Sequence, residues 1–168
     1  MKVVVSIGGS VLAPDLDAER VADYAGAIQS LDAQGHTLGT VVGGGPTARD
    51  YIGTARDLGA NEIELDQLGI AVTRLNGRLL IAALDDRAAP TPAESYDEGR
   101  EAIRRGDIPV LGASSPHRPP TRGGRLRGVR GADLLVYATS VPGVYDATRT
   151  KTTTRRGSTN SARANSST

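Results

Sequence analysis

The sequence predicts an α/β fold with a mainly parallel sheet, and three observations carry this prediction. The near-continuous apolar run over residues 3–7 is typical of a strand buried on both faces, and residues 37–42 predict a second buried strand. Segments with helical spacing separate such runs along the chain. Glycines follow the runs directly, at Gly8 and Gly9 and at residues 43–45. Because parallel sheets bind ligands beyond the carboxyl ends of their strands, these glycine turns predict a binding site.

In the first part of the chain, two strands alternate with two helices. After the strand over 3–7, apolar residues at helical spacing predict a helix over 17–33, with Asp17 as N-cap and Gly35 closing it. The second strand spans 37–42. A helix over 47–58 follows, for which Pro46 is expected at the first helical position.

The next elements are a long helix, a shorter helix and two more strands. A helix is predicted over 62–84, and acidic residues and prolines then break the pattern. A helix over 93–105, a strand over 108–111 and a strand over 133–138 complete the alternation. The buried side of the long helix is expected to consist of its apolar residues Leu65, Leu68, Ile70, Val72, Leu75, Leu79, Leu80 and Ile81.

Composition limits the class of protein. With 168 residues, 38% of them hydrophobic, the chain is long enough for one domain with a real core. It contains no cysteine, which excludes disulfides and thiolate chemistry and fits a reducing compartment. No apolar run reaches the length of a membrane span and no signal-peptide pattern is present, so a soluble cytoplasmic protein is expected.

The net charge of +1 conceals two halves of opposite sign. Residues 1–112 contain 17 acidic and 10 basic residues, a balance of −7, whereas residues 113–168 contain 2 acidic and 10 basic residues, a balance of +8. We therefore expect a domain over 1–147, with an aberrant stretch at 113–130, and a polar basic tail over 148–168 with the composition of a disordered segment.

The first glycine turn is suited to phosphate. Gly8 and Gly9 lack Cβ atoms, so they can take a positive φ and let a ligand approach the main chain closely. Their N–H groups, with the Ser10 hydroxyl, could bind phosphate oxygens. The alternative is a tight strand-to-helix turn without a ligand, and the second glycine turn favours the functional interpretation.

The second turn also fits a dinucleotide pattern. Residues 43–48 match G-x-G-x-x-A, and Glu64 or Asp66 follows at about the expected distance. The pattern nevertheless belongs to the second strand, the first strand has a glycine turn of its own, and Arg49 suits several phosphate charges. No Walker lysine motif occurs, which excludes a P-loop kinase.

Two phosphate-suited turns at one sheet edge predict phosphoryl transfer between neighbouring ligands. This reaction needs alignment, together with donors and Mg²⁺ that absorb charge on the moving group. Backbone N–H groups supply alignment, and Arg49 can add a fixed cation. Asp66 could accept hydrogen bonds from a sugar diol, or be an exposed helix carboxylate.

An ordered set of motifs extends over residues 1–112 and 131–147. Its members are Ile7 to Leu12, Val42 to Gly45, Ala48, Arg49, Asp66, Gly69, Ile70, Thr73, Arg74, Leu79 to Leu84, Ala132 to Leu135 and Gly143 to Tyr145. This set resembles the archaeal uridylate (UMP) kinases of the amino-acid kinase fold. The resemblance implies a three-layer αβα sandwich, transfer of the γ-phosphoryl group of ATP to UMP with Mg²⁺, UDP as product, and assembly as a hexamer.

The resemblance also implies roles for single residues. The ATP-binding residues would be Gly8, Gly9, Ser10, Gly45, Arg49, Thr139 and Tyr145. Gly44 would contact the UMP phosphate and Asp66 the UMP ribose. Arg49 is the catalytic candidate, and no residue is assigned to a metal.

Residues 113–122 and the chain after Ala147 depart from the family pattern, which has a UMP-binding segment at the first place and an acidic continuation at the second. As a hypothesis, both stretches are displaced reading frames: residues 148–155 can be encoded so that the frame one base earlier reads Asp-Pro-Asn-Glu-Asp-Asp-Asp-Ala. A gene without an acidic run in that frame would refute it. The chain would then be an incomplete kinase, and little phosphoryl transfer is expected.

Three other functions stay open. One is a kinase of the same fold for another small acceptor, such as isopentenyl phosphate, carbamate or an acylated amino acid, for which Asp66 would have no evident use. Another is nucleic-acid binding through the Arg-rich second half, although the tail lacks the aromatic residues used for base stacking. The third is a NAD-binding module, which NADH fluorescence would test.

Overall fold

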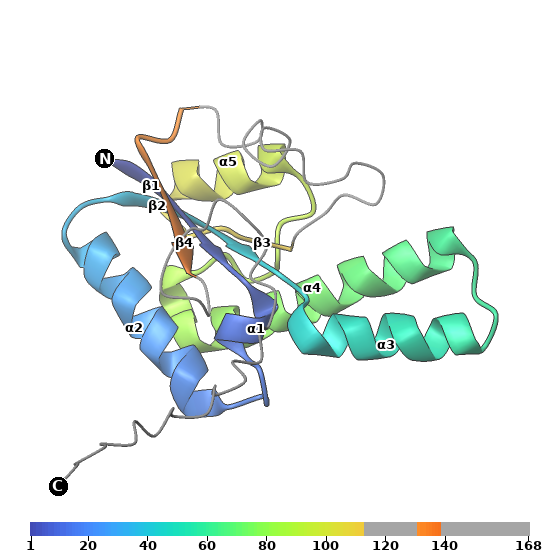
Figure 1. The fold of residues 1–168 in the computed structure, drawn as a ribbon. Coiled ribbons are helices and arrows are strands. Elements are labelled where there is room, and N and C mark those ends of the chain that lie inside the picture. The colour runs from blue at the N-terminus through green and yellow to red at the C-terminus, as the bar shows by residue number, and fades with distance from the viewer. Residues whose placement is uncertain (113–130, 139–168) are drawn as a thin grey trace, which may run out of the picture.

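Four parallel strands organise the chain, seen in a computed structural model that describes residues 1–112 and 131–138 (Figure 1). The strand order is β3-β2-β1-β4. The two inner strands are β1 (Lys2–Ile7) and β2 (Thr37–Val42), and the outer ones are β3 (Val110–Gly112) and β4 (Leu134–Ala138). All three strand pairings are parallel, as the sequence predicted.

Helices connect the strands and form a layer on each side of the sheet. Gly77 of one helix lies against Val110, whereas Gly99 of another lies against Leu111, the next residue of β3. Because successive side chains of a strand point to opposite faces, these two helices cover opposite faces and the fold has three layers, αβα. The helices are α1 (Gly9–Leu12), α2 (Ala18–Ala33), α3 (Gly45–Asp57), α4 (Glu62–Leu84), the 3₁₀ turn η1 (Asp85–Arg87) and α5 (Tyr96–Arg105).

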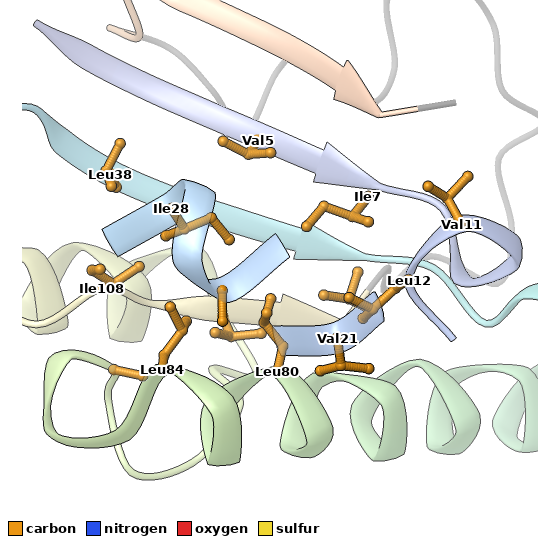
Figure 2. Close-up of a cluster of buried hydrophobic side chains, with 14 of the residues drawn as sticks. Val5, Ile7, Val11, Leu12, Val21, Ile28, Leu38, Leu80, Leu84 and Ile108 are labelled. Atoms are coloured by element: carbon orange, nitrogen blue, oxygen red, sulfur yellow. The ribbon is translucent and has the colours of Figure 1, made fainter. Parts of the chain in front are cut away.

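The core lies between the sheet and the layer that contains α2 and α4. Alternate residues of β1 point into it, and α4 supplies two fully buried leucines, Leu80 and Leu84 (Figure 2). The opposite face of β1 is only half-buried. The prediction that this strand is buried on both faces is therefore wrong for one face. The labelled core residues of Figure 2 are Val5, Ile7, Val11, Leu12, Val21, Ile28, Leu38, Leu80, Leu84 and Ile108.

Helix boundaries follow local capping signals. Asp17 caps α2 by accepting a hydrogen bond from the Glu19 N–H at 3.0 Å, as predicted, and Gly35 follows the helix with a φ of 80°. Pro46 is the second residue of α3 rather than the first, because Gly45 already begins that helix. The predicted helix over 93–105 begins later, at Tyr96.

The late start of α5 has a tertiary cause. The N–H of Ala93 donates to the carbonyl oxygen of Val110 at 2.9 Å, so this part of the chain is held beside β3. Ser95 then caps the helix by accepting from the Glu98 N–H at 3.2 Å. Similarly, the predicted strand over 108–111 begins only at Val110, because Ile108 forms a single bridge with Ala88.

The buried face of α4 differs from the expected apolar stripe. Leu75 and Leu79 are 56% and 37% exposed, whereas polar and small residues take buried positions beside the sheet. The reason is that α4 approaches β3 and the turn after β2 closely, where large side chains do not fit. Its buried residues are Leu65, Val72, Thr73, Asn76, Gly77, Leu80 and Leu84.

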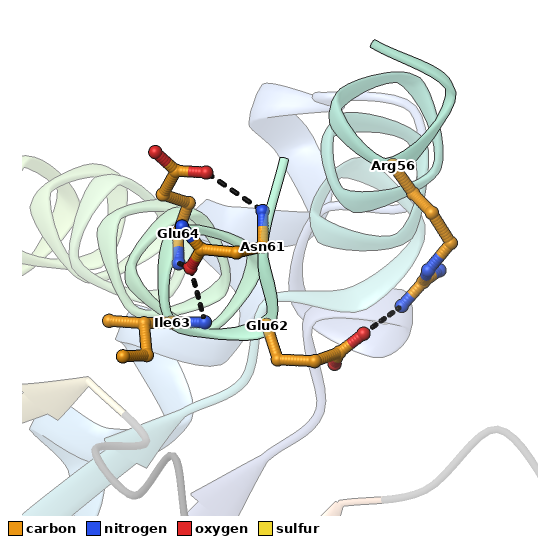
Figure 3. Close-up of polar contacts among 5 residues, drawn as sticks. All are labelled: Arg56, Asn61, Glu62, Ile63 and Glu64. Carbon is orange, nitrogen blue, oxygen red and sulfur yellow. Dashed lines mark hydrogen bonds and ion pairs between the residues drawn. The ribbon is translucent and has the colours of Figure 1, made fainter. Parts of the chain in front are cut away.

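The first half of α4 pairs with α3 in a helical hairpin that projects from the sheet (Figure 1). A capping box starts α4, in which Asn61 Oδ1 accepts from the N–H groups of Ile63 and Glu64 at 3.0 and 3.1 Å (Figure 3). Glu64 in turn accepts from the Asn61 N–H at 2.8 Å. Within residues 1–112 and 131–138, no helix combines the length and apolarity that a membrane crossing requires.

Candidate functional site

Two glycine turns touch each other at the carboxyl edge of the sheet. Ile7 pairs with Val42, so β1 and β2 end level, and the Gly43 N–H donates to the Ile7 carbonyl oxygen at 2.9 Å. A Cβ placed on Gly9 would lie 2.5 Å from both the Gly44 carbonyl carbon and the Gly45 nitrogen. The prediction that both turns lie side by side at one edge is confirmed.

The glycines of these turns serve different purposes. Gly9 is required for close approach, because the space of its missing Cβ is taken by the backbone of the second turn. Gly8 has a φ of −63°, and neither it nor Gly9 has a positive φ. The left-handed conformation occurs at Gly45, whose φ is 66°. Only Gly45 therefore needs both the freedom of φ and the absence of a side chain.

Backbone donors gather where the two turns meet. The predicted residues Gly9 and Ser10 occupy the first turn of α1, and Gly45 begins α3. N–H groups in a first helical turn have no acceptor within the helix, and at the start of the longer helix α3 the helix dipole is positive. A Cβ on Gly45 would lie 2.5 Å from the Ser10 nitrogen, so donors of both helices share one small area. This arrangement can bind an anionic ligand such as a phosphate chain.

Arg49 adds a cation next to this area. It lies on α3, one turn after Gly45, and it is exposed. No carboxylate of the described residues pairs with it.

Asp66 belongs to the face of α4 that meets the second turn. It is half-buried, and Gly69 follows it by three residues, which places both on one side of the helix. The Gly69 carbonyl oxygen lies 3.7 Å from the place where a Cβ on Gly44 would stand. The structure therefore brings the helix that carries Asp66 to the glycine turns.

A third strand also ends in glycine at this edge. Gly112, the last residue of β3, pairs with Val42. A Cβ on Gly112 would lie 2.6 Å from Thr73 Oγ1, whereas a Cβ on Gly44 would lie 3.5 Å from Thr73 Cγ2, so α4 passes this strand end more closely than it passes Gly44. Thr73 is 5% exposed and donates its hydroxyl to the Ile70 carbonyl oxygen at 2.7 Å.

Sequence reasoning missed Asn76. Its amide nitrogen donates to the carbonyl oxygens of Gly43 and Gly44 at 2.9 and 3.1 Å, and the residue is 2% exposed. An asparagine in the middle of a helix is unfavourable by propensity, and burial among apolar neighbours adds to that cost. This combination was the available signal for a polar partner.

Part of the predicted site falls on residues that the structure does not describe. Thr139 and Tyr145, the expected adenine-nucleotide contacts, lie outside the described residues, as do the stretch 113–130 and the tail 148–168. β4 ends at Ala138, which pairs with Ile7, so this strand reaches the same edge as the glycine turns. Residues 1–112 and 131–138 contain no group of three His, Cys, Asp or Glu side chains that could hold a metal ion.

Comparisons with known proteins agree with this geometry. A family model described as the amino acid kinase family matches residues 1–120. Over 148 residues, the chain is 84% identical to a protein named uridylate kinase from Haloarcula marismortui and 58% identical to one of the same name from Haloquadratum walsbyi. The crystal structure of uridylate kinase from Archaeoglobus fulgidus superposes with a TM-score of 0.80 at 39% identity.

These matches cover most of this chain but less of its relatives. The alignment to each of the two curated proteins includes 88% of this chain, but only 65% of the Haloarcula protein and 61% of the Haloquadratum protein. The superposition includes 92% of this chain and 71% of the Archaeoglobus chain. The chain thus spans somewhat less than two thirds of the length of the curated relatives.

Proposed function

Because this chain belongs to the amino acid kinase family, we propose that it acts in the transfer of the γ-phosphoryl group of ATP to UMP, which forms UDP for pyrimidine nucleotide synthesis. The observation that carries this proposal is the 84% identity to the Haloarcula uridylate kinase over 148 residues. The contact between the two glycine turns supports it, because a kinase must hold donor and acceptor phosphates next to each other.

The site would divide between the two nucleotides. Gly8, Gly9 and Ser10 would hold the ATP phosphates, with Gly45 and Arg49 beside them. Gly44 would contact the UMP phosphate and Asp66 the UMP ribose. Thr139 and Tyr145 would complete the ATP site.

In the reaction, an oxygen of the UMP phosphate attacks the γ-phosphorus of ATP, and the bond from that phosphorus to the β,γ-bridging oxygen breaks. ADP leaves with the bond's electron pair, and no covalent intermediate with the protein is required. Backbone N–H groups of the two turns align the reacting groups. Arg49 stabilises the negative charge spread over the transferred phosphoryl group, and in this sense it is the catalytic residue.

Mg²⁺ would enter with the substrate. Mg²⁺ in kinase sites is commonly held by substrate phosphates and one or two carboxylates rather than by a cage of protein ligands. The ion would neutralise charge on the β- and γ-phosphates.

The finer features of the proposal come from the resemblance to uridylate kinases. The chain would work in the cytoplasm and assemble as a homohexamer, with UMP and ATP as its ligands and no membrane or nucleic-acid partner. Because residues 113–130 depart from the UMP-binding segment of the family, transfer by this chain should be slow.

A product-resolved assay tests the proposal. The full chain is incubated with ATP, Mg²⁺ and one acceptor, and nucleotides are separated by chromatography. UDP should form with UMP, more slowly than with the Haloarcula protein in the same salt, and no product should form with isopentenyl phosphate, carbamate or an acylated amino acid. A product from one of these acceptors without UDP, or calorimetry without saturable UMP binding, would contradict the proposal.

Asp66→Asn gives the matched test of acceptor recognition. When a ribose hydroxyl no longer has a charged acceptor, UMP loses on the order of 1.5 kcal/mol of binding free energy, which is roughly tenfold in affinity. The dissociation constant of UMP should rise by that factor, while that of ATP stays within twofold. Equal weakening of both nucleotides would argue against a ribose contact of Asp66.

A further inference from the structure

Asn76 links the middle of α4 to the second glycine turn. It is 2% exposed, and its amide nitrogen donates to two successive carbonyl oxygens, those of Gly43 at 2.9 Å and Gly44 at 3.1 Å. These partners precede it by 33 and 32 residues. Both contacts are to acceptors, so the nitrogen side of the amide must face the turn.

The second glycine turn needs such a constraint, because its own residues do little to restrict its backbone conformation. Residues 43–45 are all glycine, the residue type with the most backbone conformations to lose on folding. One end of the turn is fixed by the hydrogen bond from Gly43 N–H to the Ile7 carbonyl oxygen. At the other end, the Ala48 N–H reaches the Gly44 carbonyl oxygen only at 3.4 Å.

Fixing the two carbonyl groups also fixes two donors. In a trans peptide the N–H points opposite to the C=O of the same plane, and the described part of the chain has no cis peptide bond. Because the Gly43 and Gly44 carbonyl groups point toward Asn76 on α4, the N–H groups of Gly44 and Gly45 point away from that helix. These two N–H groups belong to the residues expected at the UMP and ATP phosphates.

We propose that Asn76 is a positioning residue of the phosphate-binding turn: its side-chain amide holds the Gly43 and Gly44 carbonyl groups against α4, and so aims the Gly44 and Gly45 N–H groups at the nucleotide phosphates. The role in nucleotide binding rests on the proposed kinase function. An amide on a short side chain suits this position, because a carboxylate would place an acceptor against two acceptors and an aliphatic side chain would offer no donor.

Two variants of similar size remove the donors in different ways. Asn76→Leu replaces the amide by an apolar group, and Asn76→Asp keeps the shape but not the donors. The matched control is Thr40→Val on β2, because Thr40 is also buried and donates to one backbone carbonyl oxygen, that of Pro109 at 3.0 Å, which is not part of the turn. All three should lower the melting temperature.

Nucleotide affinity separates positioning from stability. Calorimetry of the full chain with MgATP and with UMP, below the melting temperature of every variant, should give dissociation constants raised at least tenfold in both Asn76 variants. Thr40→Val should stay within twofold of the parent. Folded Asn76 variants with unchanged dissociation constants, or an equal loss in Thr40→Val, would overturn the proposal. If neither Asn76→Leu nor Asn76→Asp folds, Asn76→Ser is used instead. Unchanged nucleotide affinity in Asn76→Ser would also overturn the proposal.

Amide relaxation keeps this inference separate from the kinase proposal. In the nucleotide-free chain, the order parameters of the Gly44 and Gly45 amides should be near 0.85, as in rigid backbone, and fall to about 0.6 in Asn76→Leu. If the parent chain binds neither nucleotide but its order parameters fall in Asn76→Leu, the kinase function would be refuted and the positioning of the turn by Asn76 would be retained. Unchanged order parameters would refute the positioning role.

Discussion

At the residue scale, two adjacent glycines have different structural requirements. Gly9 lies against the backbone of the second turn, so that a methyl group there has no space. A Cβ on Gly8 would lie 3.7 Å from Ser10 Oγ and 3.8 Å from Val11 Cγ2, which is ordinary van der Waals contact. The sequence motif presents both as equivalent, but the geometry requires only one of them to be glycine.

This difference predicts unequal effects of alanine. Gly9→Ala should destabilise the fold by about 3 kcal/mol, the upper end for overpacking, because its neighbours are backbone atoms that cannot move aside alone. Gly8→Ala should cost about 1 kcal/mol or less, the loss of a glycine N-cap. Urea denaturation measures both values, and similar losses in the two variants would contradict the close approach at Gly9.

At the element scale, α4 connects the hairpin, the site and the core. Its N-terminal half pairs with α3, its middle holds the glycine turn through Asn76, and its C-terminal half buries Leu80 and Leu84 under the sheet. The capping box at Asn61 fixes where this helix begins (Figure 3). A change at the cap is therefore expected to act on the hairpin first.

Asn61→Ala removes the acceptor of two first-turn N–H groups, those of Ile63 and Glu64. We expect a loss of about 1 kcal/mol in the free energy of unfolding. The control is Glu62→Gln, which removes the ion pair to Arg56 across the hairpin at 4.0 Å. Both of these side chains are mostly exposed, so the control should cost no more than about 0.5 kcal/mol. If Glu62→Gln lowers the free energy of unfolding more than Asn61→Ala does, the ion pair rather than the cap stabilises the hairpin.

At the scale of the whole molecule, the core between the sheet, α2 and α4 holds one helical layer against the sheet (Figure 2). Leu80 is fully buried there, whereas Leu75, on the same helix, is 56% exposed. Helical periodicity predicted that both leucines lie on the buried side of α4. Their positions relative to the sheet distinguish them.

Leu80→Ala and Leu75→Ala therefore form a matched pair. The first leaves a cavity in the core and should lower the free energy of unfolding by about 2–5 kcal/mol. The second removes an exposed side chain and should change it by about 0.5 kcal/mol or less. Both values follow from the midpoints of chemical denaturation, and a comparable loss for Leu75→Ala would mean that this side chain is covered in solution.

Much of the fold was predictable from local patterns. β2 and α4 have the predicted boundaries, because a short segment between Gly35 and Gly43 and a long helical periodicity are local signals. The meeting of Gly9 with the second turn followed from the rule that parallel strands end at one edge. The predicted start of α5 was wrong by three residues, because the bridge at Ala93 depends on a strand that comes later in the chain.

The sequence by itself determined the order of strands and helices, the two glycine turns and the charged residues beside them, because each of these is written in neighbouring residues. Only the tertiary structure decided that Gly9 cannot carry a side chain, that Leu75 faces outward, and that Asn76 holds a turn 32 residues away. The physical reason is that such contacts depend on how closely α4 and the two turns approach, and no local pattern encodes a distance between separate elements.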